Sequence, residues 1–419
     1  MPALSRGDVI IVTPEKPAAG GRMVARHHGL VLLVSGAIPG ERARVRVERV
    51  ERSLAYAAVE EPLGQHPSRR PVAFDPRCGG MVYAHIAAAE QVRLKGAIIT
   101  DALARLGKLE VPGTLAVTPS PEAGYRMRAR LHVRQNRVGY FLEGTHDICD
   151  AALTEQLQPD AVAAVRQLAA DLDAAGLSGG ADIELSENRA ADERTLHADL
   201  QPGGRLVAPA SLGAVAGVTG LSWSDARGGA QEVFGHPYVH DTVGGVRLRR
   251  HARAFFQGNR VLLEPLVSSV VEACPDGPVI DLYAGVGLFG LALAATGRHH
   301  VVAVEDHPAS VADLRANAQP LGEAVRVSDQ MVERFVSGRR PDAPFTLVLD
   351  PPRSGMSKEA ASGAVALGAS RVVFVSCDVA TFARDVRRFV DAGYRLDAVR
   401  GFDLFPATAH VEALGILTR

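Results

Sequence analysis

A buried strand that ends in a thiol lies near the end of the chain, and it constrains the fold more than any other feature. Residues 371–376 contain four consecutive apolar residues, and Cys377 follows directly. Such a run is typical of a strand inside a parallel sheet, which is buried on both faces. Phe382, Val386 and Phe389 then recur at helical spacing. The pattern predicts a strand, a tight turn that carries Cys377, and a helix.

Three earlier segments share this form. Residues 278–282, 300–304 and 346–349 are short apolar runs, and each leads into acidic or glycine residues. In open α/β sheets the carboxyl ends of the strands meet at one edge, where ligands bind. We therefore expect the residues at these strand ends to form one site. A helix amino terminus beside Cys377 would favour its nucleophilic thiolate form, whereas an inert buried cysteine is the alternative interpretation.

A glycine-rich turn after the first of these runs indicates an adenosine-type ligand. Gly285, Gly287 and Gly290 match a pattern that lets backbone approach a ligand at the start of a helix. Glu305 ends the next run, eighteen residues after Gly287, where a carboxylate can accept hydrogen bonds from ribose hydroxyls. Asp281 precedes the glycines and suits a cationic amino-acid group better than a pyrophosphate. These residues favour S-adenosylmethionine over NAD.

The N-terminal part has a different pattern. Between residues 7 and 60 short β-like runs alternate with turns, and residues 43–50 alternate between apolar and charged side chains. Small β-barrels of this size often bind oligonucleotides, although a solvated charged face explains the pattern equally well. Further along, residues 86–106 predict a long helix, and residues 125–134 predict a strand with a basic face.

These patterns predict a multidomain α/β protein. We expect a small OB-like β-barrel over residues 1–63, a central α+β domain over 64–250, and a Rossmann-like domain over 251–419. The helix near 86–106 is expected to pack on the last domain. No apolar run has the length of a membrane span, and four widely spaced cysteines do not resemble a secreted disulfide framework. We therefore expect a cytoplasmic protein without membrane contact.

Local clustering of basic residues predicts contact with nucleic acid, although the net charge of the chain is only −1. Residues 242–260 hold five arginines and no acidic residue. Guanidinium groups suit phosphates, and aromatic rings can stack on unpaired bases; an ordinary basic edge strand is the alternative. The candidates for RNA contact are Arg128, Arg130, Arg249, Arg253 and Phe256.

Taken together, these segments resemble the bacterial RNA (uracil-5-)methyltransferases. The matching motifs are Phe255-Phe-Gln257-x-Asn259, Asp281-Leu-Tyr283-x-Gly285-x-Gly287, Asp350-Pro-Pro-Arg353-x-Gly355, Ser376-Cys377-Asp378 and Asp403-x-Phe-Pro406-x-Thr408-x-His410-Val411-Glu412. Residues 20–26 and 34–42 resemble the TRAM domain, a small RNA-binding barrel that accompanies rRNA-modifying members. The resemblance implies a TRAM barrel, a class I methyltransferase domain and an RNA partner, for which a monomer suffices.

The resemblance also implies a mechanism. Uracil C5 is a poor nucleophile, so Cys377 would add to C6 and make C5 reactive toward the methyl group of S-adenosylmethionine. Glu412 would then remove the C5 proton as a general base. The cofactor-binding positions are Gln257, Asp281, Tyr283, Gly285, Gly287, Glu305 and Asp350. We expect 23S rRNA as substrate; the alternatives are a tRNA uridine, an RNA cytosine, or a catalytically silent RNA-binding protein.

Two departures from the family pattern lie close to the expected site. Leu288 stands where the family often has an amide, so that contact with the cofactor is lost. Asp378 and Val379 stand where Asn-Pro is usual, which alters the loop after Cys377 but leaves the thiol.

A third departure concerns metal. Many members of the family hold a four-iron cluster through four cysteines, but here only Cys78 and Cys149 remain, with Val72 and Met81 in two of the places. Two thiolates cannot hold such a cluster, so we expect no iron–sulfur centre and no other metal. If the backbone keeps the family's course, the two cysteine Cα atoms lie within about 7 Å, which permits a disulfide.

Overall fold

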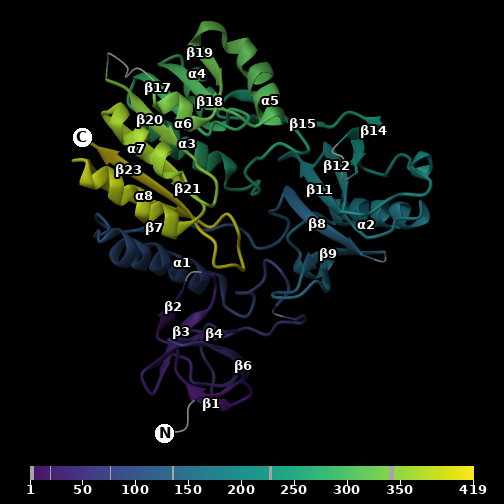
Figure 1. Ribbon diagram of the computed structural model, residues 1–419, viewed down its shortest axis with the longest axis vertical. Coiled ribbons are helices and arrows are strands. Elements are labelled where there is room, and N and C mark those ends of the chain that lie inside the picture. Colours follow the sequence, from purple (N-terminus) through teal and green to yellow (C-terminus); the bar gives the residue numbers. More distant parts are fainter. Residues whose placement is uncertain (1–3, 19, 76, 135, 226–228, 339–343) are drawn as a thin grey trace.

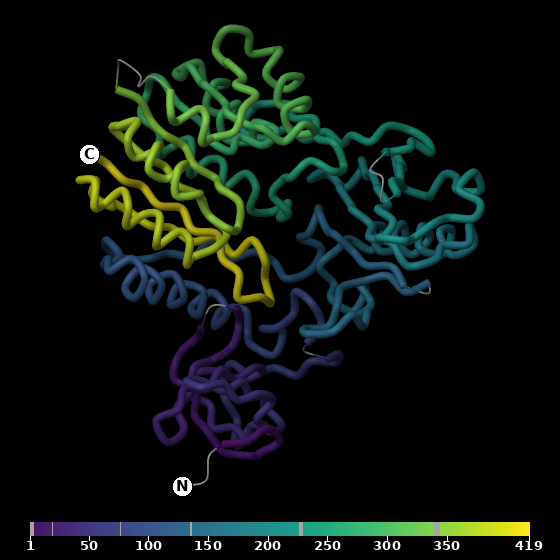
Figure 2. The backbone as a smooth tube through the Cα atoms, in the orientation of Figure 1, coloured from purple at the N-terminus to yellow at the C-terminus, as the bar shows by residue number. Residues whose placement is uncertain are grey.

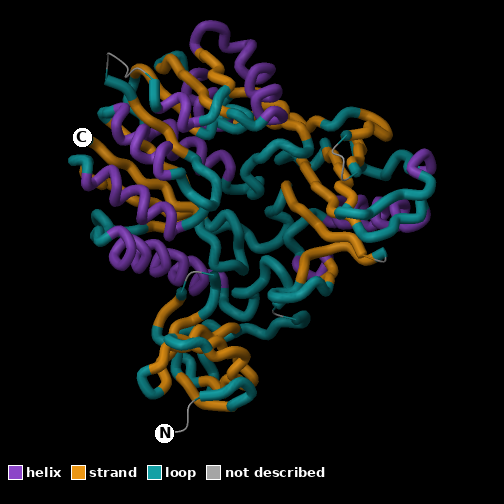
Figure 3. Tube along the Cα trace, viewed as in Figure 1, coloured by secondary structure: helices purple, strands orange, loops and turns teal. Residues whose placement is uncertain are grey.

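The computed structural model describes residues 4–18, 20–75, 77–134, 136–225, 229–338 and 344–419. Within these residues the strands form four sheets. Figure 1 shows three bodies: the N-terminal strands in purple, a central sheet in teal, and a C-terminal sheet in green and yellow. Figure 3 shows that helices gather mainly on the C-terminal sheet and that loops fill the space where the three bodies meet.

The N-terminal strands form one sheet with its own apolar core. The strands are β1 (Val9–Val12), β2 (Lys16–Pro17), β3 (Met23–His27), β4 (Leu30–Ser35), β5 (Ala43–Val50) and β6 (Leu54–Pro62), in the order β1-β5-β6-β4-β3-β2. Strand β5 buries Ala43, Val45 and Val47 and exposes the arginines between them, which confirms the alternation seen in the sequence. The six strands therefore form a β-rich unit, whose core also includes Tyr83, Ile86 and Leu94 from the chain that follows.

The central sheet has seven strands and one covering helix. They are β8 (Arg128–Arg134), β9 (Arg137–Phe141), β10 (Ile148–Asp150), β11 (Ala181–Glu187), β12 (Arg194–Leu200), β13 (Gly220–Ser224) and β14 (Ala230–Gly235), in the order β10-β9-β8-β11-β12-β13-β14. Helix α2 (Pro159–Ala174) packs on the apolar face of the sheet, where Leu168 joins a core that contains Leu131 and Ile183. The opposite face of β8 carries the basic side chains that the sequence predicts.

The C-terminal sheet has eight strands and carries the site. They are β7 (Ala116–Thr118), β17 (Gly277–Leu282), β18 (His299–Glu305), β19 (Val325–Asp329), β20 (Thr346–Leu349), β21 (Arg371–Ser376), β22 (Arg395–Phe402) and β23 (Glu412–Thr418), in the order β19-β18-β17-β20-β21-β23-β22-β7. Strands β17 to β21 run parallel, and β23 is antiparallel to β21 and β22. All four apolar runs are strands, as the sequence predicts.

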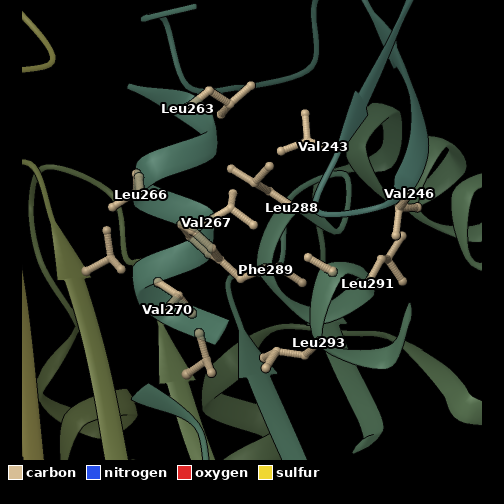
Figure 4. Packing of buried hydrophobic residues seen from close by; sticks show 14 of the residues in the cluster. Val243, Val246, Leu263, Leu266, Val267, Val270, Leu288, Phe289, Leu291 and Leu293 are labelled. Carbon is tan, nitrogen blue, oxygen red and sulfur yellow. The ribbon is translucent and has the colours of Figure 1, made fainter. Parts of the chain in front are cut away.

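Helices cover both faces of this sheet. They are α3 (Leu263–Ala273), α4 (Leu288–Ala295), α5 (Pro308–Ala318), α6 (Val332–Val336), α7 (Lys358–Leu367) and α8 (Val379–Asp391). Figure 4 shows α3 and α4 packing through Leu266, Val267 and Phe289. None of the helices within the described ranges has the length and apolarity needed to cross a bilayer.

The core of the C-terminal body includes residues that precede the domain boundary expected after residue 250. The hairpin of β15 (Tyr238–Val243) and β16 (Val246–His251) buries Val243 and Leu248 in the C-terminal core, and Figure 4 shows Val243 and Val246 beside α4. Strand β7, far earlier in the chain, pairs with β22 at the edge of the C-terminal sheet. Hydrogen bonding and apolar contact thus extend this body beyond what the sequence pattern indicates.

Helix α1 (Ala88–Ala102) continues as one π-helical turn, Leu103–Gly107, which confirms the helix expected near 86–106. It packs on the C-terminal body, because Ile98, Ile99 and Leu103 share a core with Phe382 of α8. In Figure 1 the helix lies between the N-terminal strands and α8. It therefore connects the site-bearing sheet to the rest of the chain.

The two cysteines that remain of the family's four cluster ligands lie close together, as expected. Cys78 and Cys149 form a disulfide with Cα atoms 5.6 Å apart. Val72 and Met81 join the same small apolar cluster, so packing fills the volume between the loops. Within the described residues no three His, Cys, Asp or Glu side chains are placed to hold a metal.

This disulfide generates a prediction about stability. It closes a loop with a sequence separation of 71 residues, and a cross-link of this size restricts the unfolded chain. The Cys78→Ser/Cys149→Ser variant should lose roughly 2–4 kcal/mol of unfolding free energy relative to the oxidised protein in urea titrations. Dithiothreitol should lower the midpoint of the oxidised wild type and leave that of the double variant unchanged. Equal midpoints for oxidised wild type and variant would contradict a stabilising bond.

Candidate active site

The predicted strand-end residues converge at one edge of the C-terminal sheet. Strand pairing places Asp281 beside Val348, two residues before Asp350. Ser376 pairs with Ala413, so Cys377 and Glu412 lie next to each other on adjacent antiparallel strands. Asp281, Asp350 and Cys377 lie at the carboxyl ends of parallel strands, and Glu412 lies at the start of antiparallel β23, so all four meet at one edge of the sheet.

Cys377 occupies the turn between β21 and α8, and its side chain is partly buried. The next residue begins the helix. The Asp378 carboxylate accepts hydrogen bonds from the backbone N–H groups of Ala380 (3.0 Å) and Thr381 (2.8 Å). The departure from Asn at this position therefore keeps a helix cap and leaves the thiol at the helix entrance.

The electrostatics of the thiol differ from the sequence-based expectation. Burial and, to a lesser degree, the negative charges of Glu412 and Asp350 raise the pKa of Cys377 to about 12, while Arg353 opposes them. These effects favour the neutral thiol when no ligand is bound. A positive charge beside the carboxylates would shift it toward thiolate.

Glu412 is the first residue of β23 and is 1% exposed. Burial raises its pKa well above the usual value, and the nearby Asp350 adds to this, whereas Arg353 lowers it. Among the described residues its Oε1 has no hydrogen-bond partner. A buried carboxyl with a free oxygen beside a thiol can exchange a proton with a substrate bound between them.

The glycine-rich turn has the backbone geometry that a closely bound ligand needs. Gly287 has φ +98°, and a Cβ there would lie 2.5 Å from a carbon of Leu291. The carboxylate of Glu305 accepts a hydrogen bond from the Gly285 N–H (2.8 Å), and that of Asp281 accepts one from the Gly290 N–H (2.9 Å). The second oxygen of Asp281 is buried and has no partner among the described residues.

A small hollow, with a cavity volume of about 40 Å³, lies beside this turn. Its lining includes Tyr283, Leu288, Phe289 and Asp350, and none of its described lining residues is a lysine or arginine. Gln257 donates a hydrogen bond to Asp350 (3.2 Å).

The carboxyls at this sheet edge, of which Asp350 lines the hollow and Asp281 lies beneath the glycine-rich turn, indicate the ligand. Burial raises the pKa of Asp281 to about 8 and that of Asp350 to about 7. Carboxyls held out of water without a basic partner favour a cationic ligand without phosphate, such as S-adenosylmethionine. The orphaned oxygen of Asp281 fits an ammonium group, and the aromatic and aliphatic walls fit an adenine ring. Leu288 supplies no polar contact.

The arginines proposed for RNA contact differ in their surroundings. Arg128 faces Glu184 at 3.5 Å, Arg130 binds Asp182 at 2.7 Å, and Arg249 binds Asp313 at 2.9 Å. Arg253 is exposed and forms no ion pair with the described residues. Acidic neighbours thus already neutralise three of the four guanidinium groups, which the sequence pattern did not indicate.

The structure corrects the assignment of Phe256. This ring is 4% exposed and lies in the apolar core, with the Arg250 guanidinium 4.3 Å from its centroid. A buried ring cannot stack on a base. Its neighbour Phe255 is 60% exposed at the mouth of the hollow. Adjacent aromatic residues outside a strand give no alternation that could tell the buried ring from the exposed one.

Sequence reasoning also left Arg353 out of the site. Its charge acts on both Cys377 and Glu412, so it lies close to the reacting groups. The rigid Asp-Pro-Pro turn before it is the signal that could have placed Arg353 at the same sheet edge.

Comparison with known proteins agrees with this geometry. Residues 342–419 match the family model described as tRNA (Uracil-5-)-methyltransferase. An uncharacterised RNA methyltransferase of Parasynechococcus marenigrum is 31% identical, and the match covers 95% of this chain and 93% of the relative. Another from Streptomyces avermitilis is 30% identical, with 96% of each chain covered.

A solved structure shows the same fold. The tRNA (uracil-54, C5)-methyltransferase of Pyrococcus abyssi, in complex with S-adenosyl-L-homocysteine, has a TM-score of 0.76 and 22% identity, and the match covers 98% of this chain and 100% of that one. Curated relatives align along nearly the whole chain, and the uracil-5 family model spans the segment with Cys377 and Glu412. The protein therefore belongs to the RNA (uracil-5-)methyltransferases, a family of S-adenosylmethionine-dependent enzymes.

Proposed function

We propose that the protein methylates C5 of a uridine in RNA through a covalent bond between Cys377 and C6. The observation that carries this proposal is the pairing of β21 with β23, which sets the thiol beside the buried carboxyl of Glu412. A thiol and a base on adjacent strands suit addition to C6 and removal of the C5 proton from one bound base.

The chemistry divides between the two residues. The Cys377 thiolate forms the Sγ–C6 bond, and the displaced π electrons make C5 nucleophilic. S-adenosylmethionine, when bound, supplies the methyl group that C5 takes. The Glu412 carboxylate then takes the C5 proton, the C5=C6 bond reforms, and the Sγ–C6 bond breaks to return the thiolate. Cys377 must therefore act as both nucleophile and leaving group.

The raised pKa values suggest an order of events. When no ligand is bound, burial and the negative charges of neighbouring groups disfavour ionisation of the thiol and of the carboxyls at this edge. The residues that would hold the cofactor are Gln257, Asp281, Tyr283, Glu305 and Asp350 together with Gly285 and Gly287 of the turn. A cationic ligand against Asp350 stabilises the ionised carboxylates and favours the thiolate of Cys377. We infer that the thiol becomes reactive only once the cofactor is in place.

We further propose 23S rRNA as the substrate, with the N-terminal strands acting as a TRAM-type RNA-binding barrel. The support is the double glycine and the Gly-Ala-x-Pro-Gly-Glu turn of this segment, now seen in a six-stranded unit. A second candidate is tRNA, which the name of the matching family model and the Pyrococcus abyssi enzyme favour. The expected domains 1–63, 64–250 and 251–419 remain our working division of the chain.

The catalytic assignment predicts different outcomes for two variants. Cys377→Ala should abolish both methyl transfer and the covalent complex with RNA that carries 5-fluorouridine. Glu412→Gln should still form the Sγ–C6 bond and accumulate a denaturant-stable protein–RNA adduct on unmodified RNA, because the proton is not removed. Gel electrophoresis with labelled RNA measures both. A Cys377→Ala protein that methylates at a near-normal rate would rule out the mechanism.

Cofactor binding should depend on pH through Asp281 and Asp350. Both pKa values are raised, to about 8 and about 7, so these carboxyls are neutral at low pH and ionise as pH rises. A cationic ligand prefers the ionised forms, so affinity for S-adenosylmethionine should rise by about tenfold or more between about pH 5.5 and 7.5. Calorimetry measures this. Asp281→Asn should flatten the dependence, and a flat profile for the wild type would contradict the assignment.

Charge neutralisation predicts which arginine contributes to RNA binding. Arg253→Ala should lower the slope of log affinity against log salt by about 1, because an unpaired guanidinium releases a counterion. Arg249→Ala is the matched control, since Asp313 already neutralises that side chain. Equal slopes for wild type and Arg253→Ala would remove Arg253 from the interface.

A further inference from the structure

The loop that precedes Glu412 is contacted by residues of α1, which is not part of the C-terminal sheet. Residues 403–411 join β22 to β23, and Figure 2 shows this yellow segment reaching down toward the blue chain between the bodies. Buried polar side chains of α1 meet it there. The loop that ends at Glu412 therefore contacts residues more than 300 positions earlier in the chain.

Lys95 makes the first of these contacts. Its side chain is fully buried, forms an ion pair with Asp403, and donates a hydrogen bond to the Phe405 carbonyl at 2.8 Å. Burial lowers the pKa of Lys95 and raises that of Asp403, so both charges are costly to keep here. A buried ion pair is a poor source of stability, and its geometric role is the better explanation of its presence.

Gln91, one helical turn earlier, makes the second contact. Its Oε1 accepts a hydrogen bond from the Ala407 N–H at 2.7 Å, and the Ala407 carbonyl accepts one from the Tyr83 N–H, also at 2.7 Å. Ala407 has φ +60°, a conformation that is unfavourable for alanine. Both of its backbone polar groups are thus held in place, so the strained conformation is imposed by α1 and the loop before it.

A chain of hydrogen bonds continues from these contacts toward Glu412. The Phe405 carbonyl accepts from Lys95 and also from the Thr408 hydroxyl at 2.7 Å, and the same hydroxyl accepts from the His410 N–H at 3.1 Å. These hydrogen bonds therefore connect Lys95 to His410, which lies two positions before Glu412.

We propose that Lys95 and Gln91 are positioning residues for proton removal by Glu412. This inference rests on the proposed function and concerns one step of it. Methyl transfer uses Cys377 and the cofactor residues, which lie at the ends of β17, β18, β20 and β21 and, for Gln257, in the segment before α3. Within the described ranges none of them is hydrogen-bonded to Lys95 or Gln91. Release of the product requires the Glu412 carboxylate within reach of the C5 proton, and small misplacement costs a large factor in rate.

The test compares product release with methyl transfer in single-turnover reactions. Gln91→Met removes the acceptor for the Ala407 N–H, and Lys95→Met/Asp403→Asn removes both buried charges together so that neither is left unpaired. Each should transfer the methyl group within about threefold of the wild-type rate but release the RNA at least about tenfold more slowly, so that the covalent adduct accumulates.

Tyr394→Phe is the matched control for stability. It also removes a buried hydrogen bond of the C-terminal body, from the Tyr394 hydroxyl to the Ala369 carbonyl at 2.8 Å, and does not contact the loop. It should lower the unfolding temperature and keep the wild-type ratio of release to transfer. If the α1 variants also keep that ratio, their role is structural and the inference is overturned. If the double variant does not fold, Gln91→Met decides by the same ratio.

The outcomes separate this inference from the proposed function. A wild-type protein that neither methylates RNA nor forms an adduct would refute the proposed function itself. A wild type that does both, beside α1 variants with an unchanged ratio, would refute only the positioning role.

Discussion

The antiparallel pairing of β23 with β21 and β22 is the interaction on which the site depends. It places β23 between β21 and β22, so that Glu412 at the start of β23 lies beside Cys377 at the end of β21. The parallel strands β17 and β20 bring Asp281 and Asp350 to the same edge. Because a register shift of one residue would turn Glu412 to the other face, the pairing fixes the chemistry as well as the fold.

The second governing constraint is electrostatic. Four acidic or thiol groups share an enclosed edge, and burial keeps each of them closer to neutral than it is in water. A site of this kind is poorly matched to an anion and well matched to a sulfonium or ammonium ligand. In the function that we propose, cofactor binding and activation of Cys377 are coupled, and this coupling would limit reaction of the thiol when no methyl donor is present.

Much of the fold and of the site could be predicted from the sequence, and particular residues show which features could not. The apolar runs identified β17, β18, β20 and β21 because buried parallel strands are short and continuous. Contacts between residues distant in sequence could not be predicted. The pairing of β7 with β22 and the acidic neighbours of Arg249 depend on tertiary contacts that no local pattern contains. The raised pKa of Cys377 likewise depends on burial and on Glu412 and Asp350, which lie elsewhere in the sequence.

The account is tested most directly by the product of the reaction. The purified protein, S-adenosylmethionine and unmodified RNA should be incubated, and the nucleosides then analysed by mass spectrometry after digestion. We expect one 5-methyluridine per target RNA, in 23S rRNA, with no 5-methylcytidine, and a Cys377 peptide joined to RNA in the trapped adduct. A product of 5-methylcytidine, or 5-methyluridine formed without any bond to Cys377, would contradict the account.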